Sequence, residues 1–391
     1  MNGGDLRAVL TILAIWCAGL GAAAQFGKIS ILYQDLAAEY AGAGALGLGL
    51  MVSVVGLVGL VFGTTAGLLV ARVGARRAML GALVLGAGVS LVQSVLPSYP
   101  VMMLTRVLEG VSHLAIVVVG PVAIAGAAGA RWQGAAMTLW SSFFGLTYAV
   151  LALVAPWIVA WGGDAGLFQA HAGWMIIWAL VLAAVMPRDL AAGPVGDEGG
   201  ILAQHLVIYA SPRIAAPAMG FVCYTVTYVA VLTLLPAALT PGWGGFAAVA
   251  MPLVSIGVWL TLGVWLLSRM SAVALVQAGF ATGILAALLL WLFWGQGVFE
   301  AASALLLAAS VGIVQGASFA ALAQLNPDPK DRAAGAGAIA QLGNLGTTSG
   351  TPLLALLMAH QGVNGLTLFL LGFFALGIAV HAVQARRRLN G

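Results

Sequence analysis

Apolar residues run along almost the whole chain in long stretches, separated by short breaks that carry polar residues, glycine or proline. Such stretches predict membrane-spanning helices, because a helix needs about 20 apolar residues to cross the hydrocarbon core of a bilayer. A transmembrane barrel would instead show alternating strands of about ten residues, and the sequence has no such alternation. The pattern predicts twelve spans, at residues 8–36, 45–70, 78–97, 101–127, 136–160, 168–187, 214–240, 245–268, 272–293, 298–324, 334–359 and 364–385.

The longest polar stretch, residues 188–213, divides these spans into two sets of six. We therefore expect an all-α membrane protein of two six-helix bundles related by pseudo-twofold symmetry, residues 1–187 and 214–391, joined by a cytoplasmic linker. The two halves also echo each other, since EGVS at 109–112 resembles QGAS at 315–318. A parallel duplication of this kind places a substrate site near the membrane midplane, between the halves.

The composition narrows the class further, because 62% of the residues are hydrophobic and only 7% are charged, against about 25% charged in soluble domains. Cys17 and Cys223 both lie inside apolar runs, so neither a disulfide framework nor a zinc site is indicated. The sequence pI near 9.3 comes from charges scattered over short loops, which favours membrane topology over nucleic-acid binding. We expect no cofactor, and lipid as the surroundings.

The basic residues predict the orientation in the membrane. With both termini inside, all but two of the 15 Lys and Arg residues fall in cytoplasmic segments, as the positive-inside rule requires. The two exceptions, Lys28 and Arg106, lie inside predicted helices. We predict a multi-pass protein of the bacterial inner membrane, monomeric, with both termini cytoplasmic and its first helix retained.

The loop after the second span, GLLVARVGARRAML at residues 67–80, resembles the signature loop of the major facilitator superfamily. Ala71 stands where that family usually has Asp, and Arg106 followed by Gly110 resembles its fourth-helix signature. The resemblance implies alternating access, in which one half rocks against the other, with this loop as a conformational gate. The loop residues that fit are Gly67, Arg72, Gly74, Arg76 and Arg77.

Enzyme chemistry is not indicated by the motifs. The sequence has no Gly-rich phosphate loop, no nucleophile elbow and no histidine cluster with metal spacing. It has no ATPase motif either, so any accumulation of substrate must be driven by an ion gradient or a counter-substrate. We therefore predict a secondary transporter and not an enzyme. A receptor or scaffold on the same fold is an alternative, although no soluble domain is appended to support it.

Charged residues inside the apolar spans are the candidate chemistry. In MLTRVLEGVSH, residues 103–113, the helical repeat puts Arg106, Glu109 and His113 on one face. A charge at the bilayer centre costs about 2.5–3.5 kcal/mol, so this face should meet a cavity or a partner and not lipid. Lys28 lies at a similar depth on the first span. In the family's arrangement, the first and fourth helices both line the central cavity.

One glutamate cannot neutralise two cations at full strength, so the spare positive charge suggests an anionic substrate. Arg106 and Lys28 are the predicted anion ligands, since Arg grips a carboxylate bidentately and Lys is a mobile point charge. Glu109 and His113 are the predicted proton carriers. The alternatives are that Arg106 and Glu109 only brace their helix, and that His113 is a plain wall residue.

The second half offers polar and aromatic groups in place of charges. We predict that they contribute to substrate binding and selectivity. The segment 341–352, QLGNLGTTSGTP, is either a flexible or broken helix lining the site or a row of small residues for close packing. The predicted binding residues of this half are Tyr224, Tyr228, Gln315, Gln341 and Asn344.

Sulfur ligands suggest a different cargo. Met219, Cys223 and Met251 would suit Cu(I), which prefers thioether and thiolate ligands. The chain is faintly similar to the CcoA-like copper-uptake carriers of bacteria, but Cys223 replaces one Met of their motif and Ala247 occupies the His position. Our main prediction is proton-coupled uptake of a small organic anion or vitamin-like metabolite. Copper uptake and solute export are the alternatives.

Overall fold

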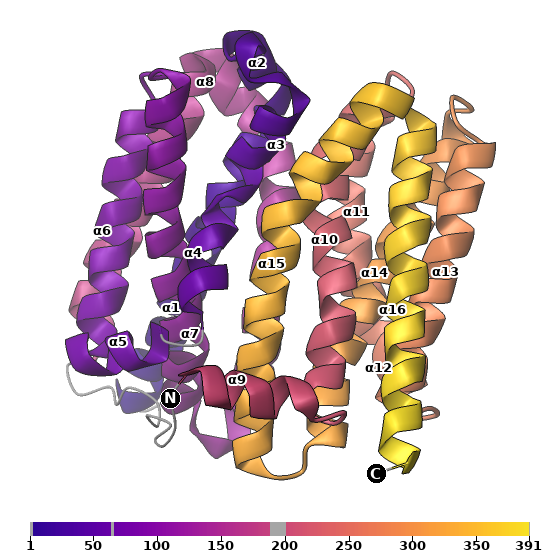
Figure 1. Ribbon diagram of the computed structural model, residues 1–391. Coiled ribbons are helices and arrows are strands. Elements are labelled where there is room, and N and C mark those ends of the chain that lie inside the picture. Colours follow the sequence, from indigo (N-terminus) through magenta and orange to yellow (C-terminus); the bar gives the residue numbers. More distant parts are fainter. Residues whose placement is uncertain (1–2, 64–65, 188–200, 391) are drawn as a thin grey trace. The chain divides into compact units, whose positions relative to one another are not determined.

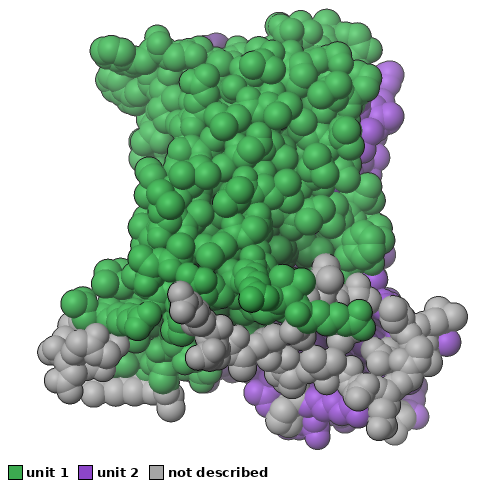
Figure 2. All heavy atoms as spheres, turned by 90° about the vertical axis from the view of Figure 1, so that its left-hand side faces the viewer, with its two compact units in different colours: residues 1–43, 57–196 green, residues 44–56, 197–391 purple. Residues whose placement is uncertain are grey.

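The computed structural model describes residues 3–63, 66–187 and 201–390, and in these ranges the chain is helical with no strand. A helix satisfies all its backbone hydrogen bonds within one segment, which lipid requires of a spanning structure. The chain divides into two compact units (Figure 2), which we describe separately. Unit 1 comprises residues 1–43 and 57–196, and unit 2 comprises residues 44–56 and 197–391.

Unit 1 is a bundle in which α1 packs against α7 and α8, and α6 packs against the same two helices. Its elements are α1 (Gly3–Ile31), α2 (Tyr33–Glu39), a 3₁₀ turn (Ala41–Ala43), most of α4 (Val55–Phe62), α5 (Ala66–Val73), α6 (Ala75–Gln93), α7 (Tyr99–Ser141) and α8 (Phe143–Val185).

Helices α7 and α8 are each two helices joined end to end. Each has 43 residues, or about 64 Å at 1.5 Å per residue, roughly twice the thickness of the hydrocarbon core. The breaks lie at Gly129 (φ 60°) and Gly163 (φ 62°), where a side chain would be strained. They fall between the predicted fourth and fifth spans and between the predicted fifth and sixth spans.

Unit 2 is built around α10, which packs against α14, α15 and α16 (Figure 1). Its elements are α3 (Gly44–Ser53), α9 (Ile201–Ala210), α10 (Ala215–Ala238), α11 (Gly244–Val258), a π-helical turn (Trp259–Gly263), α12 (Val264–Leu267), α13 (Ala272–Leu292), α14 (Val298–Leu325), α15 (Pro329–Gln361) and α16 (Val363–Asn390).

Nine helices in the described ranges are long and apolar enough to span a membrane, or ten if Tyr33–Glu39 and Ala41–Ser53 form one bent span. This agrees with the predicted all-α membrane fold. The count takes α8 once despite its break, and it omits α15, so twelve spans stays a prediction. The predicted linker, residues 188–213, lies partly outside the described residues, and its described part holds α9.

The second predicted span is divided between the units, with a break at Val54 between α3 and α4. Helix α3 packs against α15 within unit 2. A side chain at Gly49 would collide with the backbone at Pro352, and one at Gly56 would collide with the hydroxyls of Thr347 and Thr348. Glycine is needed at both positions because α3 and the first turn of α4 approach α15 closely.

Helix α15 is continuous through residues 341–352, so the broken helix considered above is not observed. A side chain at Gly346 would collide with Thr225 of α10, and one at Gly350 with the backbone of Val226. These glycines therefore serve close helix packing, the other of the two interpretations.

Glu300 joins two loops at one end of unit 2. It is fully buried, and its Oε2 accepts hydrogen bonds from the backbone N (2.9 Å) and Oγ1 (2.6 Å) of Thr240. Its Oε1 accepts from the backbone N of Gly295 at 3.1 Å. The carboxylate thus ties the α10–α11 connection to the α13–α14 connection.

Glu300→Ala is expected to destabilise the protein by about 3 kcal/mol, because it removes the buried, charged acceptor of three partly buried hydrogen bonds. Chemical denaturation of the detergent-purified protein would measure the loss. Glu300→Gln keeps an acceptor oxygen and should lose less. If the alanine variant is as stable as the wild type, the carboxylate does not hold these connections together.

Candidate functional site

Four helices of unit 1 direct polar side chains into one buried cluster. Lys28 comes from α1, Ser90 from α6, Glu109 from α7 and His171 from α8. All four are buried in a bundle whose core is mostly aliphatic and aromatic. The residues that we call the ionic cluster are Lys28, Ser90, Gln93, Arg106, Glu109 and His171.

Glu109 lies between two cations. Its Oε1 accepts from Lys28 Nζ at 2.5 Å, and its Oε2 accepts from Arg106 Nη1. Gln93 donates to the same Oε2 at 2.9 Å and to Thr105 Oγ1 at 3.0 Å. Arg106 precedes Glu109 by three residues on α7, a spacing that places the two side chains side by side on a helix. The carboxylate is therefore a counter-ion shared between α1 and α7.

Lys28 has an acceptor for each of its three ammonium protons. They are Glu109 Oε1, Ser90 Oγ at 2.9 Å and His171 Nδ1 at 3.2 Å. Its Nζ also lies 5.2 Å from the ring centre of Phe168, within the range of a cation–π contact. An anion that binds Lys28 must therefore displace an acceptor that is already in place.

Lys28, Arg106 and Glu109 are all 0% exposed. Among the described residues of unit 1, they are the buried side chains with a full formal charge. Two cations and one carboxylate leave a formal charge of +1 when the histidines are neutral. A buried charge is costly unless it is paired, so this balance favours the presence of a further anion.

Two amide oxygens beside the cluster have no hydrogen-bond partner among the described residues. They are Oε1 of Gln93 and Oε1 of Gln25, both buried. The other end of Gln25 donates to Ser112 Oγ at 2.9 Å, and Ser112 donates to the carbonyl of Ala82 at 2.7 Å. Buried acceptors normally have a donor, so both positions can take a hydrogen bond from a water or a ligand.

His113 lies on the same helix as Glu109, but its hydrogen bond goes to the backbone. Its Nδ1 is 3.0 Å from the carbonyl oxygen of Ala22, and because a carbonyl only accepts, Nδ1 carries the proton. The ring meets Phe26 edge-on, with ring centres 5.1 Å apart. The structure thus brings three of the four charged or titratable residues predicted in unit 1 into one contact set, and places His113 beside it.

The predicted tyrosine pair of unit 2 is in contact. The rings of Tyr224 and Tyr228 have centres 5.2 Å apart, and both residues are buried. Tyr224 also packs against Phe221, at 5.1 Å. The two predicted binding residues therefore form a short aromatic column on α10.

The predicted amide residues of unit 2 have separate surroundings. Gln341 accepts a hydrogen bond from Tyr209 of α9 at 2.9 Å. Asn344 donates to the carbonyl of Ala340 on its own helix at 2.8 Å, and Gln315 is half-buried on α14. Their role in substrate selectivity stays a prediction.

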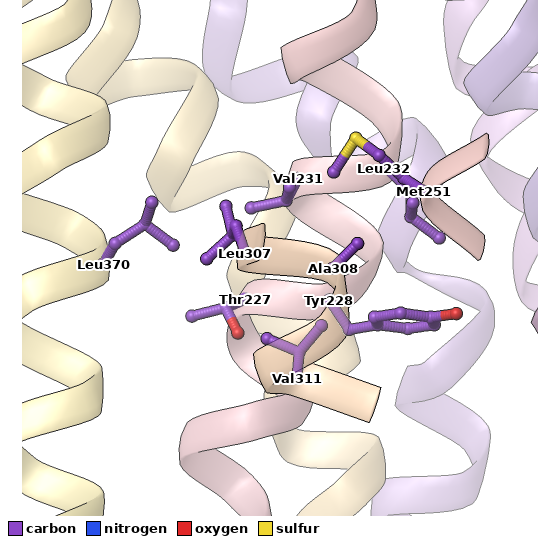
Figure 3. A pocket seen from close by; sticks show the side chains of 9 residues that line it. All are labelled: Thr227, Tyr228, Val231, Leu232, Met251, Leu307, Ala308, Val311 and Leu370. Atoms are coloured by element: carbon purple, nitrogen blue, oxygen red, sulfur yellow. The ribbon is translucent and has the colours of Figure 1, made fainter. Parts of the chain in front are cut away.

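The predicted sulfur ligands do not share one site. Met219 Sδ accepts from Gln384 Nε2 of α16 at 3.0 Å, whereas Met251 lines a small cavity beside Tyr228 (Figure 3). Tyr228 follows Met219 by nine residues, roughly 14 Å along α10. The cavity, about 10 Å³, has room for about one water. No group of three His, Cys, Asp or Glu residues is placed for a metal in the described ranges.

The loop that resembles the family signature caps the end of a helix. Arg76 donates through Nε to the carbonyl of Met186 (3.2 Å) and through Nη2 to that of Ala183 (2.6 Å). The last carbonyls of α8 have no partner within the helix, and a cation there also complements the helix dipole. The gating role of the loop stays a prediction. Arg72 and Arg77 are exposed, and Gly74 is the N-cap residue just before α6. The side chain of Ala71 and the surroundings of Gly67 lie outside the description.

Three members of the ionic cluster were not predicted from the sequence: Ser90, Gln93 and His171. A signal for His171 was present, since an ionisable residue inside a predicted span is a functional candidate by itself. Ser90 and Gln93 lie three residues apart on one face of α6. Neutral polar residues of this kind become candidates only when a charged partner is known to face them.

Apolar helices of spanning length and a buried ionic cluster are typical of membrane transport proteins. The family model of the Major Facilitator Superfamily matches residues 11–351. The match covers most of the chain, so the protein belongs to this family of multi-pass membrane transporters, as the signature loop indicated. A comparison with curated proteins finds no match.

Proposed function

We propose that the protein takes up a small organic anion or vitamin-like metabolite together with a proton, across the bacterial inner membrane, as a monomer with both termini cytoplasmic. The observation that carries this proposal is the sharing of Glu109 by the buried cations Lys28 and Arg106. A substrate carboxylate offers the same two oxygens as Glu109, so it can take the same place between the cations.

Substrate binding then follows as an exchange of carboxylates. Arg106 binds the substrate through its planar fork of donors, and Lys28 supplies a mobile point charge. Glu109, once displaced, or His113 takes up a proton. One anion and one proton add no net charge, so the loaded cluster carries the same formal charge of +1 as the empty cluster. The residues Tyr224, Tyr228, Gln315, Gln341 and Asn344 supply selectivity in this proposal.

Copper uptake is the second candidate, supported by one feature. Met219 and Cys223 lie one helical turn apart on α10, and Cys223 is buried. The separate placement of Met251 weighs against a three-ligand site. Export of a solute would use the same architecture in the opposite direction.

A thermal-shift screen of the detergent-purified protein tests these candidates. The probes are carboxylates from lactate to citrate, riboflavin and Cu(I). A ligand at one hundred times its dissociation constant stabilises by about 2.7 kcal/mol, which is readily measured. We expect a shift with a carboxylate that disappears in Lys28→Ala. A shift with copper alone that survives Lys28→Ala and is lost in Cys223→Ala would overturn the anion proposal.

A further inference from the structure

The hydrogen bonds around His171 determine which ring nitrogen carries its proton. Nε2 lies 3.0 Å from the carbonyl oxygen of Gly21, which can only accept, so Nε2 carries a hydrogen. Nδ1 lies 3.2 Å from Lys28 Nζ, which can only donate, so Nδ1 presents a lone pair. His171 is therefore neutral in this arrangement, with its basic nitrogen directed at the ammonium group.

A second acceptor for His171 is already in place. Ser90 Oγ donates its hydrogen to the carbonyl of Phe168 at 2.9 Å, so its lone pairs face the cluster. It lies 2.9 Å from Lys28 Nζ and 3.0 Å from His171 Nδ1. If Nδ1 gained a proton, it could donate to Ser90 Oγ without a change of position.

We propose that His171 is the proton-carrying group of the ionic cluster, and that its protonation releases Lys28 to bind the substrate anion. A proton binds the Nδ1 lone pair and forms an N–H bond, and the hydrogen bond from Lys28 to Nδ1 is lost. Nδ1–H then donates to Ser90 Oγ. The formal charge of the cluster rises from +1 to +2, and a bound anion returns it to +1. This inference rests on the proposed uptake of an anion together with a proton, and it assigns the proton to His171 in place of Glu109 or His113.

The other two candidates are less suited to hold this proton. Each oxygen of Glu109 already accepts a hydrogen bond from a cation, Lys28 or Arg106. A proton added to either oxygen would therefore point at another hydrogen-bond donor, which is unfavourable. His113 uses Nδ1 on a backbone carbonyl, and its ring packs on Phe26. At His171 the structure shows an alternative acceptor, Ser90 Oγ, 3.0 Å from the nitrogen that would be protonated.

The charged groups that face His171 come from two helices. Lys28 of α1 contacts it directly, and Glu109 and Arg106 of α7 lie behind Lys28. Helix α6 contributes the neutral hydroxyl of Ser90. Protonation of His171 therefore acts first on Lys28, the nearest cation and the one whose hydrogen bond it breaks.

NMR of ¹⁵N-histidine-labelled protein in lipid nanodiscs tests the assignment without any substrate. The signal of His171 is identified by its loss in His171→Asn. We expect Nδ1 to lack a proton at high pH and to gain one on acidification. In Lys28→Ala, protonation should need less acid, because a neighbouring cation is gone. A proton on Nδ1 at high pH, or a signal that does not respond to Lys28→Ala, would overturn the proposal.

Transport by variants in proteoliposomes gives a second test. His171→Asn places an amide near the position of Nδ1, where it can accept from Lys28 but cannot titrate. With radiolabelled lactate and succinate as probes, it should lose accumulation driven by a pH gradient, because no proton can release Lys28 from the amide. Accumulation that persists in His171→Asn and disappears in His113→Asn would assign the proton to His113 instead. If the wild type moves neither probe, the proposed function fails, and the NMR result still decides the role of His171.

Discussion

Glu109→Ala is expected to destabilise the protein by about 3–5 kcal/mol, because breaking a buried ion pair leaves an uncompensated charge. Both Lys28 and Arg106 lose the carboxylate that they share, and both are fully buried. The free energy of unfolding can be measured by chemical denaturation of the full-length protein in detergent, with the wild type as the reference.

Two further variants separate charge from shape. Glu109→Gln keeps the volume and one acceptor oxygen but removes the charge, so it should be destabilising to a smaller extent. Combining Glu109→Ala with Lys28→Met removes one of the two buried cations, and the double variant should recover part of the stability, since residues in contact do not add independently. A single alanine variant as stable as the wild type would show that the cations do not need this counter-ion.

Lys28→Ala and Arg106→Ala are each expected to abolish uptake of a carboxylate without preventing membrane insertion. Each removes one of the two charges that hold the anion in the proposed exchange with Glu109. Uptake of labelled lactate or succinate into proteoliposomes measures the effect, and the amount of protein in the membrane fraction monitors insertion. Normal uptake by both variants would exclude the anion site.

Matched substitutions make this result specific. Arg106→Lys keeps the charge but loses the planar, bidentate fork, so it should weaken binding while retaining some transport. Arg269, in unit 2, lies over the ring of Trp265 at 5.0 Å and is not a member of the ionic cluster. Arg269→Ala removes an arginine of the same charge and should leave uptake unchanged.

The charged members of the site could be predicted from the sequence because charged residues are rare inside membrane-spanning segments. Lys28, Arg106 and Glu109 stand out in apolar spans, and the estimate of similar depth agrees with the ion pairs observed. His171 and Ser90 were missed because their importance depends on which helix faces which. One sequence gives the periodicity of each helix but not the rotation of one helix against another.

The fold also has features that the sequence predicts and features that depend on how the helices pack. Long apolar runs predicted helices, and the glycine breaks at Gly129 and Gly163 agree with predicted span boundaries. The glycines of α15 were ambiguous, since both a flexible helix and a closely packed helix use small residues. The contact of Gly350 with the backbone of Val226 resolves that ambiguity in favour of packing.

The packing of α3 against α15 has a consequence for dissecting the molecule. Helix α3 precedes residue 188, yet the partner that its Gly49 fits, Pro352, lies far along the chain in the last third. Cutting the polypeptide between α8 and α9 would thus give two fragments that each lack half of one tight helix contact. The N-terminal fragment would expose the surface of α3 around Gly49, and the C-terminal fragment would expose the part of α15 around Pro352. Fragment complementation and chimeras between homologous carriers therefore have to exchange α3 and α15 as a pair.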